Sequence, residues 1–297
     1  INYEIYYERI DLIELEAVLA ILTCNVVLMS ASYTMLIPFL PMYLINELGV
    51  TSDNVNMWSG IIFSVTFIVS AVMAPIWGKL SDKKGRKPMA VRAGVGLAIT
   101  YFICGIVSSP IQLMFARILQ GFAAGLWPAE LAIMSSYAPK EKLGFCMGVM
   151  QGALTAGGVI GPLLGGVLAS VFGMRVSFFI SAGALALITL ITLIFIKEPP
   201  REAKTPEQLA LAKEAEKVNL LKVPMIRRML ECAVVIQMAI LILQPILTLY
   251  VAELHHSMDN VIMLSGMVFS LGGFAGAISA PLWGRYGQSH GFSVLCV

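Results

Sequence analysis

Long apolar stretches, nearly free of Asp, Glu, Lys and Arg, recur along the whole chain. A helix needs about 20 such residues to cross the hydrocarbon layer of a bilayer, where backbone groups must be paired within their own segment. The pattern therefore predicts eight membrane-spanning helices rather than strands or loops. Their predicted positions are Ala17–Ile45, Asn54–Gly78, two helices within Ala93–Ala138 separated by a turn at Ser108–Pro110, Leu143–Met174, Val176–Ile196, Cys232–Ala252 and Asn260–Gly284.

Positive charge gathers in every second connection between these predicted helices. Lys and Arg are dense after the second and sixth helices, whereas the connections after the first, third and seventh have none and the connection after the fifth has only Arg175. Cytoplasmic connections carry such an excess of positive charge. We therefore expect a multi-pass protein of the cell (inner or plasma) membrane, with both ends in the cytoplasm.

The first two predicted helices recur later in the chain. Met57–Gly85 aligns without gaps on Met263–Gly291, and the sequence Ala-Pro-x-Trp-Gly occurs at the same place in both copies. Shared Pro, Trp and Gly at fixed offsets favour a true repeat over chance similarity of apolar segments. The repeat predicts a six-helix bundle over 1–197, a cytoplasmic linker over 198–228, and over 229–297 a partial second bundle with helices 7, 8 and the start of a ninth.

The predicted linker is charged and begins with Pro, and Thr205-Pro-Glu-Gln208 has the form of a capping box. This favours a helix on the cytoplasmic surface, and a solvated linker between two bundles is the alternative.

Composition narrows the class further. Hydrophobic residues make up 58% of the chain and charged residues 13%, against about 25% charged in soluble domains. The net charge of +2 gives no basic surface for nucleic acid. The five cysteines lie in apolar runs without metal spacing, which favours a packing role over a disulfide or a metal site. No catalytic triad or phosphate-binding motif is visible, so we expect neither an enzyme nor a cofactor.

The connection after the second predicted helix reads Gly78-Lys-Leu-Ser-Asp82-Lys-Lys-Gly85-Arg86-Lys87. Gly78 allows the helix end to pack closely, and Gly85 permits a positive φ in a tight reversal. Asp82 can accept hydrogen bonds from exposed helix N–H groups, and Arg86 can fork onto a carboxylate. The alternative is a basic loop that only sets the topology.

The fifth predicted helix is rich in glycine. Spacing of four places Gly157, Gly161 and Gly165 on one face, where a neighbouring backbone can approach closely. Pro162 removes one hydrogen bond of the helix and bends it. Generic packing of small residues is the alternative explanation.

Two ionisable residues lie inside the fourth predicted helix. Arg117 is costly in lipid and therefore functional or paired, unless it snorkels to the outer interface. Glu130 follows an apolar run, and an apolar environment favours its neutral form, which suits a group that takes up and releases a proton. The two lie 13 residues apart, about 20 Å along a helix, so we expect no direct ion pair. The alternatives for Glu130 are the cytoplasmic interface or a pair with an arginine of the loop after the second helix.

Several other polar side chains lie inside predicted spans. Amides facing lipid are expensive, so some of these groups are expected to line a cavity, with interhelical hydrogen bonds as the alternative. They are Asn25, Tyr33, Gln120, Gln151, Gln237 and Gln244.

These motifs resemble those of the major facilitator superfamily. The loop at Gly78–Lys87 is similar to its motif A, Arg117-x-x-Gln120-Gly121 to motif B, and the glycine face with Pro162 to motif C, which marks the exporter branches. The resemblance is closest to the 12-helix drug:proton antiporters of bacteria. It implies an all-α membrane protein of the major facilitator fold, with a complete N-terminal six-helix bundle and the first part of the C-terminal bundle. The sequence predicts eight helices, whereas these antiporters have twelve. We therefore expect a C-terminally incomplete chain that does not transport alone.

The resemblance also implies roles for the motifs. Motif A would latch the two halves on the cytoplasmic side, and Arg117 would face the central cavity and tune proton transfer. The inferred function is export of drugs or other small amphiphilic molecules in exchange for protons, by a monomer that alternates its access. Related exporters often have an Asp at the positions of Ser135 and Ser136, which leaves Glu130 as the expected proton carrier. The alternative is a carrier of a sugar, amino acid or other metabolite on the same scaffold.

Overall fold

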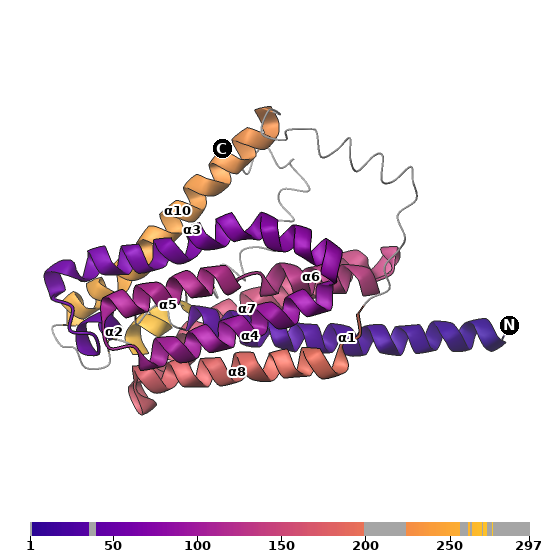
Figure 1. The fold of residues 1–297 in the computed structure, drawn as a ribbon, viewed down its shortest axis with the longest axis horizontal. Coiled ribbons are helices and arrows are strands. Elements are labelled where there is room, and N and C mark those ends of the chain that lie inside the picture. The colour runs from indigo at the N-terminus through magenta and orange to yellow at the C-terminus, as the bar shows by residue number, and fades with distance from the viewer. Residues whose placement is uncertain are drawn as a thin grey trace.

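The computed structural model describes residues 2–35, 40–198 and 224–255, together with parts of 261–275. These residues form helices and connections, with no strand among them. The helices, with the labels of Figure 1, are α1 Asn2–Thr34, α2 Leu40–Asn46, α3 Ser52–Lys84, α4 Arg86–Ile106, α5 Pro110–Ala123, α6 Leu126–Tyr137, α7 Lys140–Phe172, α8 Met174–Phe195 and α10 Pro224–His255.

Five of the described helices contain segments that are long and apolar enough to cross a membrane. The segments are Leu15–Thr34, Ser52–Lys84, Arg86–Ile106, Lys142–Phe172 and Met174–Phe195. They overlap the first, second, third, fifth and sixth predicted spans, and the prediction of an all-α membrane protein is confirmed. Two predicted spans differ, because Ala17–Ile45 extends over both α1 and α2, and the fourth span is divided into α5 and α6.

The helices run side by side along the long axis of the molecule, and α10 leaves the bundle at an angle (Figure 1). The most extensive contacts join α1 to α7, α4 to α8 and α3 to α5, so the bundle brings together segments far apart in the sequence. Its interior contains large side chains with almost no exposure, such as Leu22, Tyr43, Tyr101 and Phe178.

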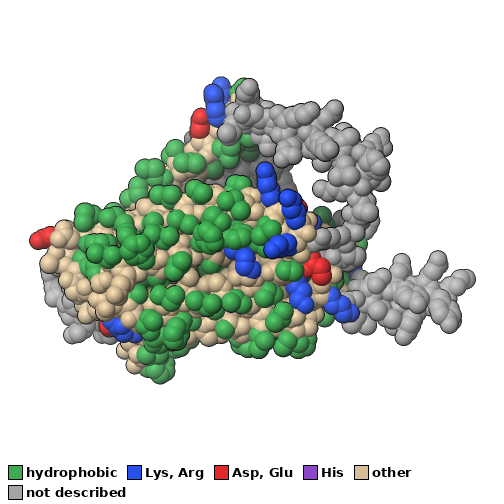
Figure 2. Space-filling view, viewed as in Figure 1, with side chains coloured by type: hydrophobic (Ala, Val, Ile, Leu, Met, Phe, Trp, Pro, Cys, Tyr) green, Lys and Arg blue, Asp and Glu red, His purple; other side chains and the backbone are tan. Residues whose placement is uncertain are grey.

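The outer surface of this bundle is apolar. Val72, Phe145 and Val171 are 64%, 69% and 66% exposed, and hydrophobic side chains cover the flank in Figure 2. Lys and Arg side chains gather toward one end of the bundle in the same view. A soluble protein rarely exposes so large an apolar surface, whereas a bilayer covers it. The arrangement is that of a multi-pass membrane protein.

Two predictions lie outside the described residues. They are the surface helix expected from the capping box at Thr205–Gln208 and the second copy of the loop motif at Gly284–Phe292.

Candidate functional site

The fourth predicted span is broken at Ala124 and Gly125, between α5 and α6. Gly125 has a φ of 116°, in the left-handed region that side chains other than glycine avoid. Helix α5 starts with Ser109 as its cap, since the Ser109 hydroxyl accepts a hydrogen bond from the Gln112 N–H at 3.3 Å. The break separates Arg117, on α5, from Glu130, on α6.

Arg92 of α4 and Trp77 of α3 hold this break together. The Arg92 guanidinium donates to the carbonyl oxygens of Ala124 at 2.9 Å and Phe122 at 3.3 Å, and the Trp77 indole N–H donates to Phe122 O at 2.9 Å. The guanidinium also stacks over the Trp77 ring, 3.9 Å from its centroid. Carbonyl groups freed at the end of a helix need such donors, so these two side chains stabilise the broken conformation.

Glu130 points into the interior of the bundle and has no exposed surface. Both of its carboxyl oxygens lack a hydrogen-bond partner among the described residues. Asn25 of α1 lies beside it, and Asn25 Nδ2 donates to Thr192 Oγ1 of α8 at 2.7 Å. The Asn25 Oδ1 atom is also buried without a partner. Three helices therefore meet at a cluster in which acceptor oxygens outnumber the available hydrogens.

A proton on Glu130 would supply the missing hydrogen. The charged groups that α4 presents to α6 are engaged elsewhere, with Arg92 at the break and Arg86 near the far end of α6. A buried carboxylate without a counter-ion or donors costs several kcal/mol. The geometry suits a carboxyl group that binds a proton and releases it when its surroundings change. In this structure Glu130 neither reaches the surface nor pairs with Arg86.

The second ionisable residue of the span is buried as well. Arg117 is 7% exposed, and its Nη1 atom donates to Gln120 Oε1 at 2.8 Å. Its positive charge lies close enough to act on the hydroxyl groups of Tyr33 and Tyr101. The guanidinium is thus held inside the bundle, on the opposite side of the break from Glu130.

The loop after α3 makes its contacts within the described bundle. Gly85 has a φ of 112°, as its place in a tight reversal predicts. The Arg86 guanidinium donates to Ala132 O and to the hydroxyl groups of Ser135 and Ser136 near the end of α6, and no carboxylate pairs with it among the described residues. The two serines thus supply hydroxyl acceptors where related exporters often have an Asp.

A carboxylate does cap the start of α4, but it is Glu198 and not Asp82. Its two oxygens accept from the N–H groups of Arg86 at 2.8 Å and Lys87 at 2.9 Å. Asp82 is exposed and lies, with Gly78, on a cavity of about 430 Å³ between α3, α4 and α6. Glu198 follows α8, so this contact ties the end of the six-helix bundle's sequence to the start of α4.

The glycine face of α7 packs against α1. A Cβ atom on Gly157 would lie 2.5 Å from Val27 O and 2.7 Å from Ser30 Cβ, and Gly161 and Gly165 lie equally close to Ala31 and Met35. The face that bears Pro162 instead meets Gly266, and the Ser270 hydroxyl donates to Val159 O at 2.6 Å. Helix α7 therefore joins α1 to the segment that follows α10.

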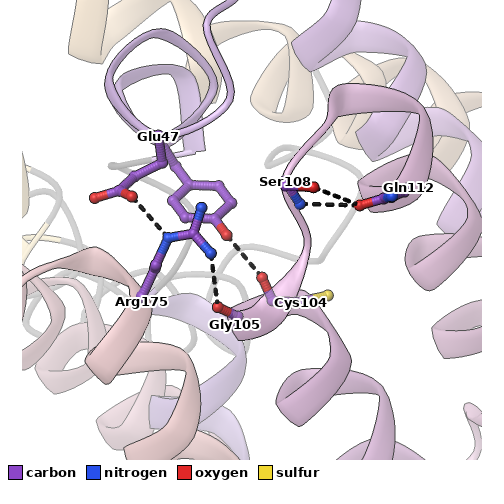
Figure 3. Close-up of polar contacts among 7 residues, drawn as sticks. Glu47, Cys104, Gly105, Ser108, Gln112 and Arg175 are labelled. Atoms are coloured by element: carbon purple, nitrogen blue, oxygen red, sulfur yellow. Dashed lines mark hydrogen bonds and ion pairs between the residues drawn. The ribbon is translucent and has the colours of Figure 1, made fainter.

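A separate polar cluster lies at the end of the bundle opposite the loop that follows α3 (Figure 3). Arg175 Nε at the start of α8 pairs with Glu47 Oε2 at 2.7 Å, and Arg175 Nη1 donates to Gly105 O at 3.3 Å. The Tyr43 hydroxyl donates to Cys104 O at 2.8 Å. These bonds tie α8 and the end of α2 to the last turn of α4.

The remaining polar candidates divide by exposure. Asn25 and Gln120 are buried and hydrogen-bonded as described above, whereas Tyr33, Gln151 and Gln237 are exposed. The side chain of Gln244 is not among those described. Where the structure describes the chain, no three His, Cys, Asp or Glu side chains lie together as metal ligands would.

With this geometry in view, the chain can be compared with known proteins. The model of a family described as Major Facilitator Superfamily matches residues 22–295. This chain belongs to the Major Facilitator Superfamily. Family membership therefore supports a carrier rather than an enzyme.

Curated relatives within the family are similar over most of the chain. The multidrug resistance protein MdtG of Enterobacter lignolyticus is 38% identical over 266 residues, and the protein of the same name from Proteus mirabilis is 36% identical over 265 residues. The alignments cover 89% of this chain in both cases, and 63% and 65% of the relatives. The chain thus spans less than two thirds of their length.

Solved structures confirm the fold. The nucleoside transporter NupG superposes with a TM-score of 0.67 at 14% identity, over 92% of this chain and 68% of NupG. A bacterial homologue of the human lysosomal transporter Spinster gives 0.54 at 22% identity, over 66% of this chain and 47% of that one. The predicted major facilitator fold is confirmed.

Two contributors to the site were not identified from the sequence. In the sequence, Arg92 is one of the Lys and Arg residues that follow the second predicted helix, and Glu198 is the first residue of the predicted linker. Nothing local marks either residue, because their partners lie 32 and 112 positions away along the chain.

Proposed function

We propose that this chain belongs to a proton-coupled exporter of drugs or other small amphiphilic molecules, which lies in the inner cell membrane with both ends in the cytoplasm. The 36–38% identity to multidrug resistance proteins supports this substrate class. The strong asymmetry of Lys and Arg between alternate connections supports the orientation.

The observation that carries the proton coupling is the Glu130 carboxyl group. It is fully buried beside Asn25 of α1, and neither oxygen has a hydrogen-bond partner among the described residues. An uncharged carboxylic acid fits this core, whereas a carboxylate draws water or a hydrogen-bond donor toward itself. Loss or gain of the proton therefore changes how three helices pack, which is the requirement for coupling a proton to a conformational change.

The cycle that follows is alternating access between the two bundles. An amphiphilic molecule enters from the cytoplasm or the inner leaflet, the bundles rock, and the molecule leaves on the outer side. A proton from outside then binds Glu130 and returns the carrier to its inward-open state. Rigid-body rocking of helical repeats around a central site is how such carriers work.

Two motifs support the rocking step. Arg86 joins the loop after α3 to the end of α6, so a movement of that loop is transmitted to the helix that carries Glu130. The glycine face of α7 holds α1, which carries Asn25, at backbone distance. The proton site is therefore mechanically linked to the cytoplasmic latch (Gly78, Asp82, Gly85 and Arg86) and to the antiporter motif (Gly157, Gly161, Pro162 and Gly165).

Everted vesicles containing the full-length protein test this function. A proton gradient should drive accumulation of several unrelated amphiphilic dyes, and Glu130→Gln should abolish the gradient-driven part. Glu231→Gln is the matched control, because Glu231 is an exposed acid on α10 that pairs with Arg227 four residues earlier. Undiminished gradient-driven uptake by Glu130→Gln would refute the role of this carboxyl. Uptake restricted to a single metabolite would favour the alternative carrier.

A further inference from the structure

The polar cluster around Arg117 has more hydrogen-bond donors than acceptors, whereas the cluster around Glu130 has more acceptors than donors. Arg117 and Gln120 are only 7% and 1% exposed. One hydrogen bond joins them, from Arg117 Nη1 to Gln120 Oε1, while Arg117 Nε and Gln120 Nε2 are buried without an acceptor. Here hydrogens outnumber acceptor oxygens, and one of the donor groups carries a positive charge.

Two phenols lie within electrostatic reach of this cluster. Tyr101 of α4 lies beside Gln120 and is 1% exposed, so its hydroxyl is part of the buried cluster. Tyr33 of α1 lies near Arg117 and is 37% exposed. A hydroxyl group can turn its hydrogen toward an incoming oxygen. The cluster can therefore offer donors from three helices, and Tyr33 is its exposed member.

The other arginines of the bundle show how this fold satisfies an arginine with a structural role. Arg175 pairs with Glu47 and with a backbone carbonyl, Arg92 with two carbonyl groups, and Arg86 with a carbonyl and two serine hydroxyls. Among the described residues Arg117 has one acceptor, the Gln120 amide oxygen, although it is more buried than any of these arginines. A cation buried in a membrane protein without a counter-ion is expensive and marks a functional site.

We propose that Arg117 and Gln120, with the hydroxyl groups of Tyr33 and Tyr101, form a binding subsite for a carboxylate or similar small oxyanion carried by an amphiphilic substrate. The planar guanidinium fork matches two oxygens of such a group, and charge-assisted hydrogen bonds are strong where water is excluded. Arg117 is then a specificity-determining residue that contacts substrate. This inference rests on the proposed export function and names part of its substrate range.

The break at Gly125 keeps this subsite apart from the proton site. Arg117 and Gln120 belong to α5, whereas Glu130 belongs to α6 and lies beside Asn25. An anionic group at Arg117 therefore does not compete for the proton at Glu130. The two parts of one predicted span would serve two different chemistries, substrate recognition and proton binding.

Binding of two matched dyes to the detergent-solubilised full-length protein tests the subsite. Fluorescein and its methyl ester differ by one carboxylate, and fluorescence anisotropy measures the affinity of each. We expect fluorescein to bind more tightly, and Arg117→Gln to weaken fluorescein about 10- to 100-fold while leaving the ester nearly unchanged. Arg228→Gln, at an exposed arginine of α10, is the matched control and should change neither affinity.

A second variant keeps the test decisive if Arg117→Gln folds poorly. Gln120→Glu is nearly isosteric and places a carboxylate 2.8 Å from the Arg117 guanidinium, in the position of the present amide oxygen. It should block fluorescein binding by occupying Arg117, and it should raise the thermal transition temperature. Unchanged fluorescein binding by Gln120→Glu would overturn the proposal.

Other outcomes also decide the matter. Equal affinity of the wild type for the two dyes, or an equal loss of both in Arg117→Gln, would show that the arginine does not recognise the carboxylate. These are binding measurements without a proton gradient. Carboxylate selectivity without proton-driven transport would therefore refute the exporter and not the subsite, whereas transport without carboxylate selectivity would do the reverse.

Discussion

Replacing Gly157 by alanine tests whether the glycine face of α7 is required for helix packing. The added Cβ would lie 2.5 Å from Val27 O, whereas ordinary contact begins at 3.4 Å, so α1 and α7 must separate locally by about 3.4 − 2.5 = 0.9 Å. The obstacle is backbone, which no rotamer change removes. The same shift stretches the hydrogen bond from the Ser30 hydroxyl to Leu154 O, now 2.7 Å.

The expected cost is that of overpacking a well-packed interior, about 1–3 kcal/mol. Gly148→Ala on the same helix is the matched control, because its Cβ would meet nothing within 4 Å. That control should be neutral or gain about 0.5–1 kcal/mol from helix propensity. Thermal unfolding in detergent should place Gly157→Ala several degrees below Gly148→Ala. Equal transition temperatures for the two variants would refute the close approach of α1 and α7.

Three further experiments test contacts that the sequence did not reveal. Arg92→Met removes the guanidinium donors at the helix break and should cost about 1–3 kcal/mol in thermal unfolding, while Lys83→Met, at an exposed lysine in the last turn of α3, should cost little. Glu198→Ala removes the cap of α4 and should cost about 0.5–1 kcal/mol, with faster hydrogen exchange confined to the first turn of that helix. A double-mutant cycle on Glu47 and Arg175 should give a coupling of about 0.2–1 kcal/mol, since both side chains are about one-third exposed, and zero coupling would contradict the pair.

Much of the fold follows from hydropathy, because lipid requires each spanning segment to satisfy its own backbone. The break between α5 and α6 cannot be predicted from hydropathy. Gly121 and Gly125 are spaced as a packing face, yet Gly121 alone meets a neighbouring backbone, at Thr66 O and Ser70 N. Gly125 instead adopts a positive φ, which its spacing does not distinguish. The donors that stabilise the break come from Arg92 of α4 and Trp77 of α3, which are far from Gly125 in the sequence.

The sequence predicts the two ionisable residues of the candidate site, but it does not predict which side chains lie beside them. Glu130 and Arg117 stand out because charge is rare in apolar segments, and their separation excludes an ion pair. Their actual neighbours, Asn25 and the phenols of Tyr33 and Tyr101, come from other helices. Which amides are buried and which are exposed depends on how the helices rotate against one another, and hydropathy leaves that rotation undetermined.

The central claim is that the carboxyl group of Glu130 binds the coupled proton. Infrared difference spectroscopy between high and low pH detects the C=O stretch of a carboxylic acid as it gains a proton. The wild-type protein should show such a band, Glu130→Gln should lose it, and Asn25→Leu should shift it because the neighbouring amide is removed. A band that persists unchanged in Glu130→Gln would place the proton on another group and contradict the account.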